Sequence, residues 1–168
     1  MYFHKLLFLL LLSTNVFALS TDREQPIRIE ADSAKLDNIK MRVVYQGNVI
    51  ITQGTIRLTA EQVILNYTKK QEIDKVIALG KPAYFQQRLD SGEDIKAQAK
   101  EMEYDAQKNT LYLKKNAELT KGKNGQKTYT SNAPRIMYDT QRGIIKADKG
   151  KENEGRIIMT FKPQPKNK

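Results

Sequence analysis

Residues 47–67 read GNVIITQGTIRLTAEQVILNY, and their pattern predicts β-structure. From residue 56 to residue 60, apolar and polar side chains alternate, which is the period of a strand with one buried face. Gln53-Gly54 is typical of a turn. We interpret the polar pair Glu61-Gln62 as a second break, after which the alternation resumes. The stretch therefore predicts three short strands separated by polar turns, and no helix.

Composition limits the chemistry that the chain can perform. Its 168 residues are enough for one domain with a substantial core, and they include no Cys and a single His, His4. Without His4, which lies in a predicted cleaved segment, no thiol nucleophile, imidazole base or ordinary zinc ligand set remains. We predict no cofactor and no metal. The formal charge of +10 favours anionic partners, although a solvated surface with a basic tail is the simpler reading.

The N-terminal segment has the features of a secretory signal peptide. A basic start precedes the apolar run Leu6–Leu12, and Val16-Phe17-Ala18 matches a cleavage site. The alternative is a retained membrane anchor, but a membrane-spanning helix needs about 20 apolar residues. We predict residues 1–18 as signal peptide, residues 19–161 as one β-domain, and residues 162–168 (KPQPKNK) as a disordered basic tail.

A repeat of about 35 residues organises the domain. Similar segments, each beginning at a small residue, are 31–37, 60–67, 97–104 and 131–138. We interpret the pieces beginning at Gly47, Gly80 and Lys115 as matching links between strands. Short antiparallel strands in such units favour either a flattened barrel or jellyroll, or a twisted open-ended roll of V-shaped turns. The recurring small residues indicate either tight packing or a slot left open for acyl chains; they are Ala31, Ala60, Ala97, Ala99, Ser131 and Ala133.

The segment GNVIITQGTIRLTAEQV, with QPIRIEADSAKLD before it and GKPAYFQQ after it, resembles the OstA-like family. The resemblance covers Gln25–Asp148 and is most specific over Gln25–Leu65. It implies an all-β fold, a twisted open-ended β-jellyroll of stacked antiparallel V-shaped strands. It also implies a periplasmic carrier that takes lipopolysaccharide from an inner-membrane transport complex to an outer-membrane translocon. Members of the family join end to end, and to like-folded domains of those partners, through edge strands.

The ligand implied by this resemblance has several acyl chains and a phosphorylated sugar head. Burying one CH₂ contributes about 0.8 kcal/mol, so a carrier needs only an apolar groove. We predict that the groove is lined by the inward apolar set Ile27, Ile29, Val49, Ile51, Ile56, Leu58, Val63, Leu65, Phe85, Met102, Tyr104, Leu111 and Leu113. A register error would exchange the whole set for the opposite face, and each residue taken alone fits a sealed core better than a groove. Candidate phosphate contacts at the rim are Arg23, Arg28, Lys35 and Arg57, with a solvated surface as the alternative.

Other function classes have weaker support in the sequence. An enzyme would need a nucleophile or a paired carboxylate, and Glu101 and Glu103 fit a solvated strand face better. A basic β-sheet module that binds an anionic glycan or another envelope polymer is the main alternative. Nucleic acid is not expected, because aromatic residues make up 8% of the chain and are not interleaved with basic ones. Exposed edges at Ile27–Ala31 and Arg156–Phe161 predict head-to-tail self-association.

Overall fold

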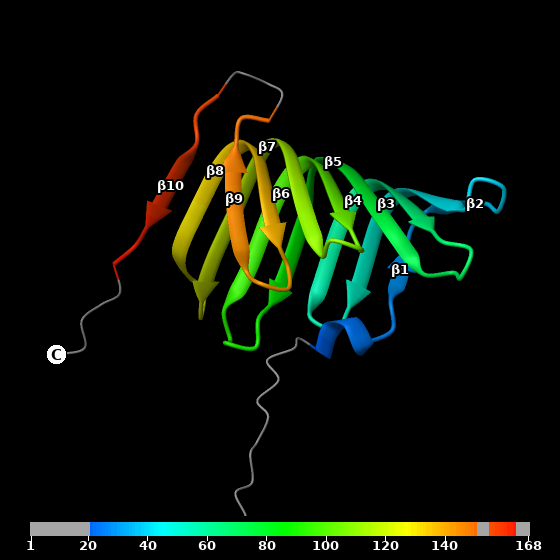
Figure 1. Cartoon of the computed structure of the whole chain (residues 1–168), viewed down its shortest axis with the longest axis horizontal. Coiled ribbons are helices and arrows are strands. Elements are labelled where there is room, and N and C mark those ends of the chain that lie inside the picture. The colour runs from blue at the N-terminus through cyan, green and yellow to red at the C-terminus, as the bar shows by residue number, and fades with distance from the viewer. Residues whose placement is uncertain (1–20, 151–154, 164–168) are drawn as a thin grey trace, which may run out of the picture.

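The chain folds into a single antiparallel sheet that is strongly twisted (Figure 1). The computed structural model describes residues 21–150 and 155–163. A short 3-10 helix, η1 (Thr21–Glu24), precedes ten strands. These are β1 (Arg28–Glu30), β2 (Ser33–Asp37), β3 (Arg42–Gln53), β4 (Ile56–Tyr67), β5 (Ile73–Arg88), β6 (Asp94–Asp105), β7 (Thr110–Lys123), β8 (Gln126–Asp139), β9 (Ile144–Asp148) and β10 (Ile158–Phe161). The predicted signal peptide and residues 164–168 of the predicted tail lie outside the described residues.

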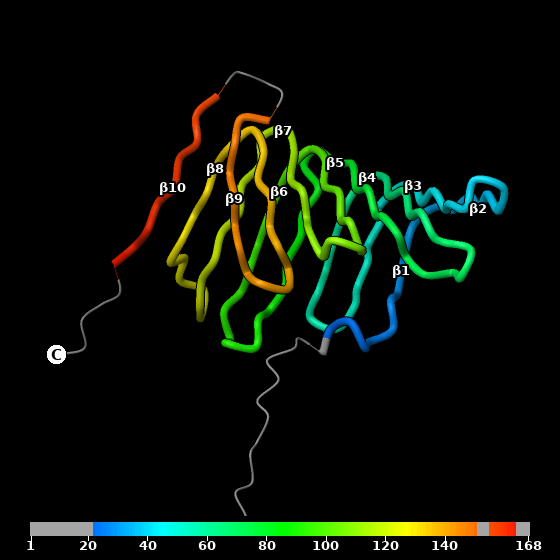
Figure 2. The backbone as a smooth tube through the Cα atoms, viewed as in Figure 1, coloured from blue at the N-terminus to red at the C-terminus, as the bar shows by residue number. Residues whose placement is uncertain are grey.

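The all-β prediction is confirmed, but the strands are longer than the sequence pattern suggested. Each strand from β3 to β8 is continuous through a bend that follows the same line across the sheet (Figure 2). The pairing register shifts at this line, for example between Gln46 and Val49 of β3 and between Lys114 and Ala117 of β7. The pieces that we predicted as links, beginning at Gly47, Gly80 and Lys115, are therefore bends within strands.

Left-handed backbone conformations occur at the bends of β3 and β7. Gly47 and Asn48 have φ values of 80° and 44°, and Lys115 and Asn116 have values of 64° and 61°. Residues of this kind form β-bulges, which bend a strand without ending it. Glu61-Gln62, predicted as a turn, is likewise an interior part of β4. Our prediction of three short strands in residues 47–67 was wrong for this reason.

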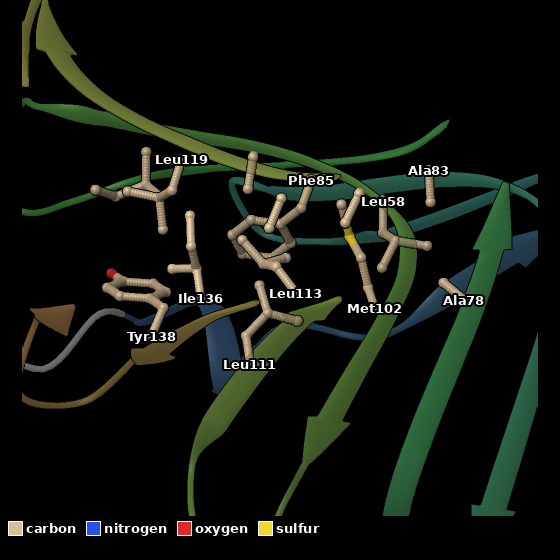
Figure 3. Close-up of a cluster of buried hydrophobic side chains, with 14 of the residues drawn as sticks. Leu58, Ala78, Ala83, Phe85, Met102, Leu111, Leu113, Leu119, Ile136 and Tyr138 are labelled. Carbon is tan, nitrogen blue, oxygen red and sulfur yellow. The ribbon is translucent and has the colours of Figure 1, made fainter. Parts of the chain in front are cut away.

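The bends divide the sheet into two arms that face each other. Arm A contains the segments 42–46, 62–67, 73–79, 101–105, 110–114 and 135–139, and arm B contains 49–53, 56–60, 83–88, 94–99, 117–123 and 126–133. Figure 3 shows Leu58, Phe85 and Leu119 of arm B close to side chains of arm A. Small buried residues line the vertex where the arms meet: Ala78, Ala83, Ala99, Ala117 and Ala133. At the vertex, small side chains therefore serve close packing.

Both ends of the sheet carry a broken strand. At one end, β1 pairs with arm B of β3 and β2 pairs with arm A. At the other end, β9 and β10 pair with the two arms of β8. The predicted edges thus lie at opposite ends of the strand order. Both carry exposed apolar side chains, with Ile27 42% exposed and Phe161 72% exposed.

A ladder of ion pairs crosses the outer face of arm A. Lys114 Nζ lies 2.7 Å from Glu103 and 3.1 Å from Glu101, and Lys75 and Lys115 extend the ladder on either side. The hydrogen bond from Lys114 is the largest influence on Glu103 and holds its pKa below the ordinary value, against a smaller opposing effect of burial. Each of the two glutamates that we considered as a catalytic pair, Glu101 and Glu103, therefore forms ion pairs with two lysines.

This ladder predicts an acid-dependent loss of stability. The pKa of Glu103 is lower in the folded state than its ordinary value of 4.5. Its contribution to the free energy of unfolding is therefore complete above pH 4.5 and is lost as the pH falls through the folded-state pKa. Glu103→Gln should reduce the free energy of unfolding at pH 7 by about 1 kcal/mol at most, since the pair is partly exposed. The difference in the free energy of unfolding between this variant and the unmodified protein should disappear at pH values below the folded-state pKa of Glu103. Denaturant titrations across pH measure it, with Glu72→Gln as a control outside the ladder. A difference independent of pH would contradict the assignment.

Candidate functional site: an apolar groove between the arms

A groove opens between the two arms toward the β1 end of the sheet. It encloses about 290 Å³, close to the lower limit for small-molecule sites. Nine of the thirteen predicted lining residues border it: Ile27, Ile29, Ile51, Ile56, Leu58, Leu65, Phe85, Tyr104 and Leu111. Ile73, Val76 and Ala106 also border the groove and were missed, although Val76 pairs directly with Leu65 and shares its face. The wall of the groove is thus almost entirely aliphatic and aromatic.

The other four predicted lining residues lie in the sealed core. Val49, Val63 and Leu113 are 0% exposed, and Met102 is 1% exposed. None of the four borders the groove. They lie on the same inward face of the sheet as the nine groove residues, because directly paired residues such as Met102 and Leu113 point to the same side of the sheet. The sequence therefore predicted correctly which side chains point inward. Packing against the opposite arm determines which of them remain open to the groove.

Toward β8, buried side chains fill the space between the arms. Leu119, Ile136 and Tyr138 are packed there within the buried cluster (Figure 3). Burial raises the pKa of the Tyr138 hydroxyl to about 12, so this group stays neutral at physiological pH. The open groove is therefore lined mainly by β1 and β3 to β7, and the space beside Ile136 and Tyr138, near the end of β8, is closely packed.

Polar groups surround the mouth of the groove. Asp22, Arg23, Gln53, Gln87, Thr140 and Gln141 border it alongside the apolar wall. Of the predicted rim cations, only Arg23 lies there. Arg28 pairs with Glu30 at 3.1 Å, and Lys35 is exposed on β2. Sequence reasoning missed Asp22 and Gln87, since an isolated acid or amide carries no positional signal.

A second, polar hollow lies on the outer face of arm B. It also encloses about 290 Å³. Its border contains three cations, Arg57, Lys96 and Lys127, one acid, Glu118, and otherwise uncharged residues such as Tyr84. Arg57 thus faces away from the groove, because its neighbours Ile56 and Leu58 face into it. This hollow is the feature that would suit an anionic glycan.

The groove can bind but offers little for catalysis. Its wall contributes no carboxylate pair, and Asp22 is engaged in hydrogen bonds with Thr55 and Gln87. Within residues 21–150 and 155–163, no three potential ligands gather closely enough to hold a metal ion. In the same part of the chain, no helix has the length and apolar character to cross a membrane. The arrangement suits an extended apolar ligand whose polar end remains at the mouth.

Comparison with known proteins gives consistent results. Residues 28–144 match the family described as LptA/(LptD N-terminal domain) LPS transport protein. The chain is 36% identical over 160 residues to the lipopolysaccharide export system protein LptH of Pseudomonas aeruginosa, covering 92% of this chain and 89% of that protein. It is 36% identical over 162 residues to LptA of Haemophilus influenzae, covering 93% and 91%. A crystal structure of the Pseudomonas aeruginosa LptH, described as a periplasmic component of the lipopolysaccharide transport device, superposes with a TM-score of 0.76 at 35% identity. That superposition covers 86% of this chain and all of the other.

Proposed function

Because this chain belongs to the LptA/LptD N-terminal domain family of lipopolysaccharide transport proteins, we propose that it carries lipopolysaccharide by holding acyl chains in the groove between its arms. The observation that carries this proposal is the open apolar groove with a polar mouth. An acyl chain buried there gains about 0.8 kcal/mol per CH₂, which is sufficient without any chemical step. The protein is thus a carrier and not an enzyme.

The groove residues divide by role in this proposal. The half-buried residues Ile29, Ile51, Ile56 and Tyr104 meet the acyl chains, together with the exposed edge of Ile27. Leu58, Leu65, Phe85 and Leu111 form the floor. The sealed core residues pack the two arms against each other and do not reach the groove; they are Val49, Val63, Met102 and Leu113.

The location that we propose is the periplasm. The predicted signal peptide at residues 1–18 supports export, and the Pseudomonas aeruginosa relative is described as periplasmic. The partners are an inner-membrane transport complex, met through an OstA-like domain, an outer-membrane translocon and further copies of this chain. Among residues 21–150 and 155–163, β1 and β10 each pair with a neighbour on one side only, which supports contacts of this kind, since an unpaired edge can accept another strand.

The test is to identify the lipid that the protein retains. Protein purified from the cell envelope should carry lipopolysaccharide, detected by mass spectrometry of the extracted lipid. Protein unfolded in denaturant and refolded without lipid should lose it and recover it on addition of purified lipopolysaccharide. Retention of ordinary phospholipid in membrane proportions would contradict the proposal. Retention of an acidic glycan without acyl chains would instead favour the polar hollow at Arg57, Tyr84 and Lys96 as the functional site.

A further inference from the structure

The segment before β1 is fastened to the tip of arm B by a buried carboxylate. Asp22 is 3% exposed, and its Oδ1 accepts a hydrogen bond of 2.7 Å from the Thr55 amide. Its Oδ2 accepts hydrogen bonds from the Thr55 hydroxyl at 2.7 Å and from Gln87 at 3.3 Å. Gly54 permits this approach, because a Cβ there would lie 2.3 Å from Asp22 Oδ1. We call residues 21–25 the N-terminal strap.

The strap continues from this anchor across the open side of the groove. Gln53 Nε2 donates hydrogen bonds to the backbone oxygens of Arg23 and Gln25, at 3.3 Å and 3.1 Å. The Arg23 guanidinium then reaches Thr140 Oγ1 at 3.4 Å. Thr140 lies in the turn after β8, at the tip of arm A, and Thr55 lies at the tip of arm B. In Figure 1, η1 lies below the sheet, on the side opposite the bends.

Arg23 is therefore a fixed cation at the mouth of an apolar groove. Its guanidinium is exposed, and no carboxylate within the described residues forms an ion pair with it. A guanidinium offers a planar set of donors that matches phosphate and carboxylate oxygens. An amphiphile whose chains enter the groove leaves its head at this mouth, within reach of the donors that Thr140 does not use.

We propose that Arg23 is a recognition residue for an anionic head group, phosphate or carboxylate, on the bound amphiphile, and that Asp22 is the residue that positions it. This inference rests on the proposed function, because it assigns the polar part of the same ligand. Asp22 acts through its hydrogen bonds to Thr55 and Gln87, which fix the backbone next to Arg23.

The test compares two amphiphiles with the same chain and different heads. Lauryl phosphate and lauryl maltoside are titrated below their micelle concentrations against the full mature protein. Arg23→Gln should weaken binding of lauryl phosphate roughly tenfold, as expected for loss of a charge-assisted hydrogen bond, and leave lauryl maltoside within about twofold. Arg57→Gln is the matched control, because it removes the same charge from the outer face.

Asp22 is tested through head-group selectivity. Asp22→Ala should lower the preference for lauryl phosphate although Arg23 is still present, and Asp22→Asn should restore part of it by accepting the Thr55 amide. Thermal unfolding of each variant separates this effect from loss of fold. Equal weakening of both amphiphiles by Arg23→Gln, or no weakening of either, overturns the assignment. If the unmodified protein binds lipopolysaccharide and neither variant changes selectivity, this inference fails while the proposed function stands. If it binds no amphiphile, both fail.

Discussion

Replacing Leu113 with arginine is expected to unfold the domain, whereas Ile56→Arg should leave it folded and unable to hold lipid. Leu113 is 0% exposed and lies among side chains of both arms (Figure 3). An arginine there would bury an unpaired charge at a cost of several kcal/mol, which is comparable with the whole stability of a small domain. Ile56 is half-buried at the groove, so its replacement can extend the charged group into the mouth.

Thermal unfolding and lipopolysaccharide binding, measured on the same preparations, check this pair. We expect Ile56→Arg to melt within a few degrees of the unmodified protein and to bind lipopolysaccharide at least roughly tenfold more weakly. Thr59→Arg is the control, since it places the same side chain on the outer face of the same strand. Equal melting defects in the Ile56 and Leu113 variants would show that the groove is part of the sealed core.

A proline in β10 is expected to abolish head-to-tail assembly without disturbing the fold. The amide of Lys162 donates to Thr128, so alternation along the ladder directs the amide of Met159 toward the free edge. Met159→Pro removes that outward donor while the pairing of β10 with β8 is kept. Contact between a β10 edge and a β1 edge is heterologous, so it can propagate instead of closing as a dimer.

Light scattering over a concentration series measures the effect. The unmodified protein should grow in mass with concentration, and Met159→Pro should remain monomeric over the same range. Met159→Thr keeps the outward amide and should assemble normally, which separates the backbone effect from the loss of an apolar side chain. A monomeric mass for the unmodified protein at every concentration would rule out self-association through these edges.

The sequence predicted the fold well where alternation is regular. Ile56, Leu58 and Ala60 were assigned to one face, and the structure places them on the inner face of β4. Alternation failed at Glu61-Gln62, because a polar pair within a bulge has the same composition as a polar turn. Ala60 and Val63 both contact the core although they are three residues apart. Strict alternation would place two such residues on opposite faces of the strand, so it cannot predict this arrangement.

The candidate site was less predictable for two physical reasons. Val63 and Leu65 have the same chemistry and face the same way, yet only Leu65 borders the groove. Accessibility depends on the side chains of the opposite arm, which are distant in sequence. Asp22 was missed because its partners, Thr55 and Gln87, are brought to it only by the folded sheet.

Because the bends of β3 to β8 follow one line, the length of the space between the arms and its depth are set by different features of the chain. Each long strand supplies a segment to both walls, so adding one more bent hairpin would lengthen the space between the arms. The depth depends only on how far each strand runs from bend to tip. Duplication or loss of a single repeat would therefore change the length of this space, and the inward side chains of that repeat would decide whether the added length is open, as near β1, or filled, as around Tyr138.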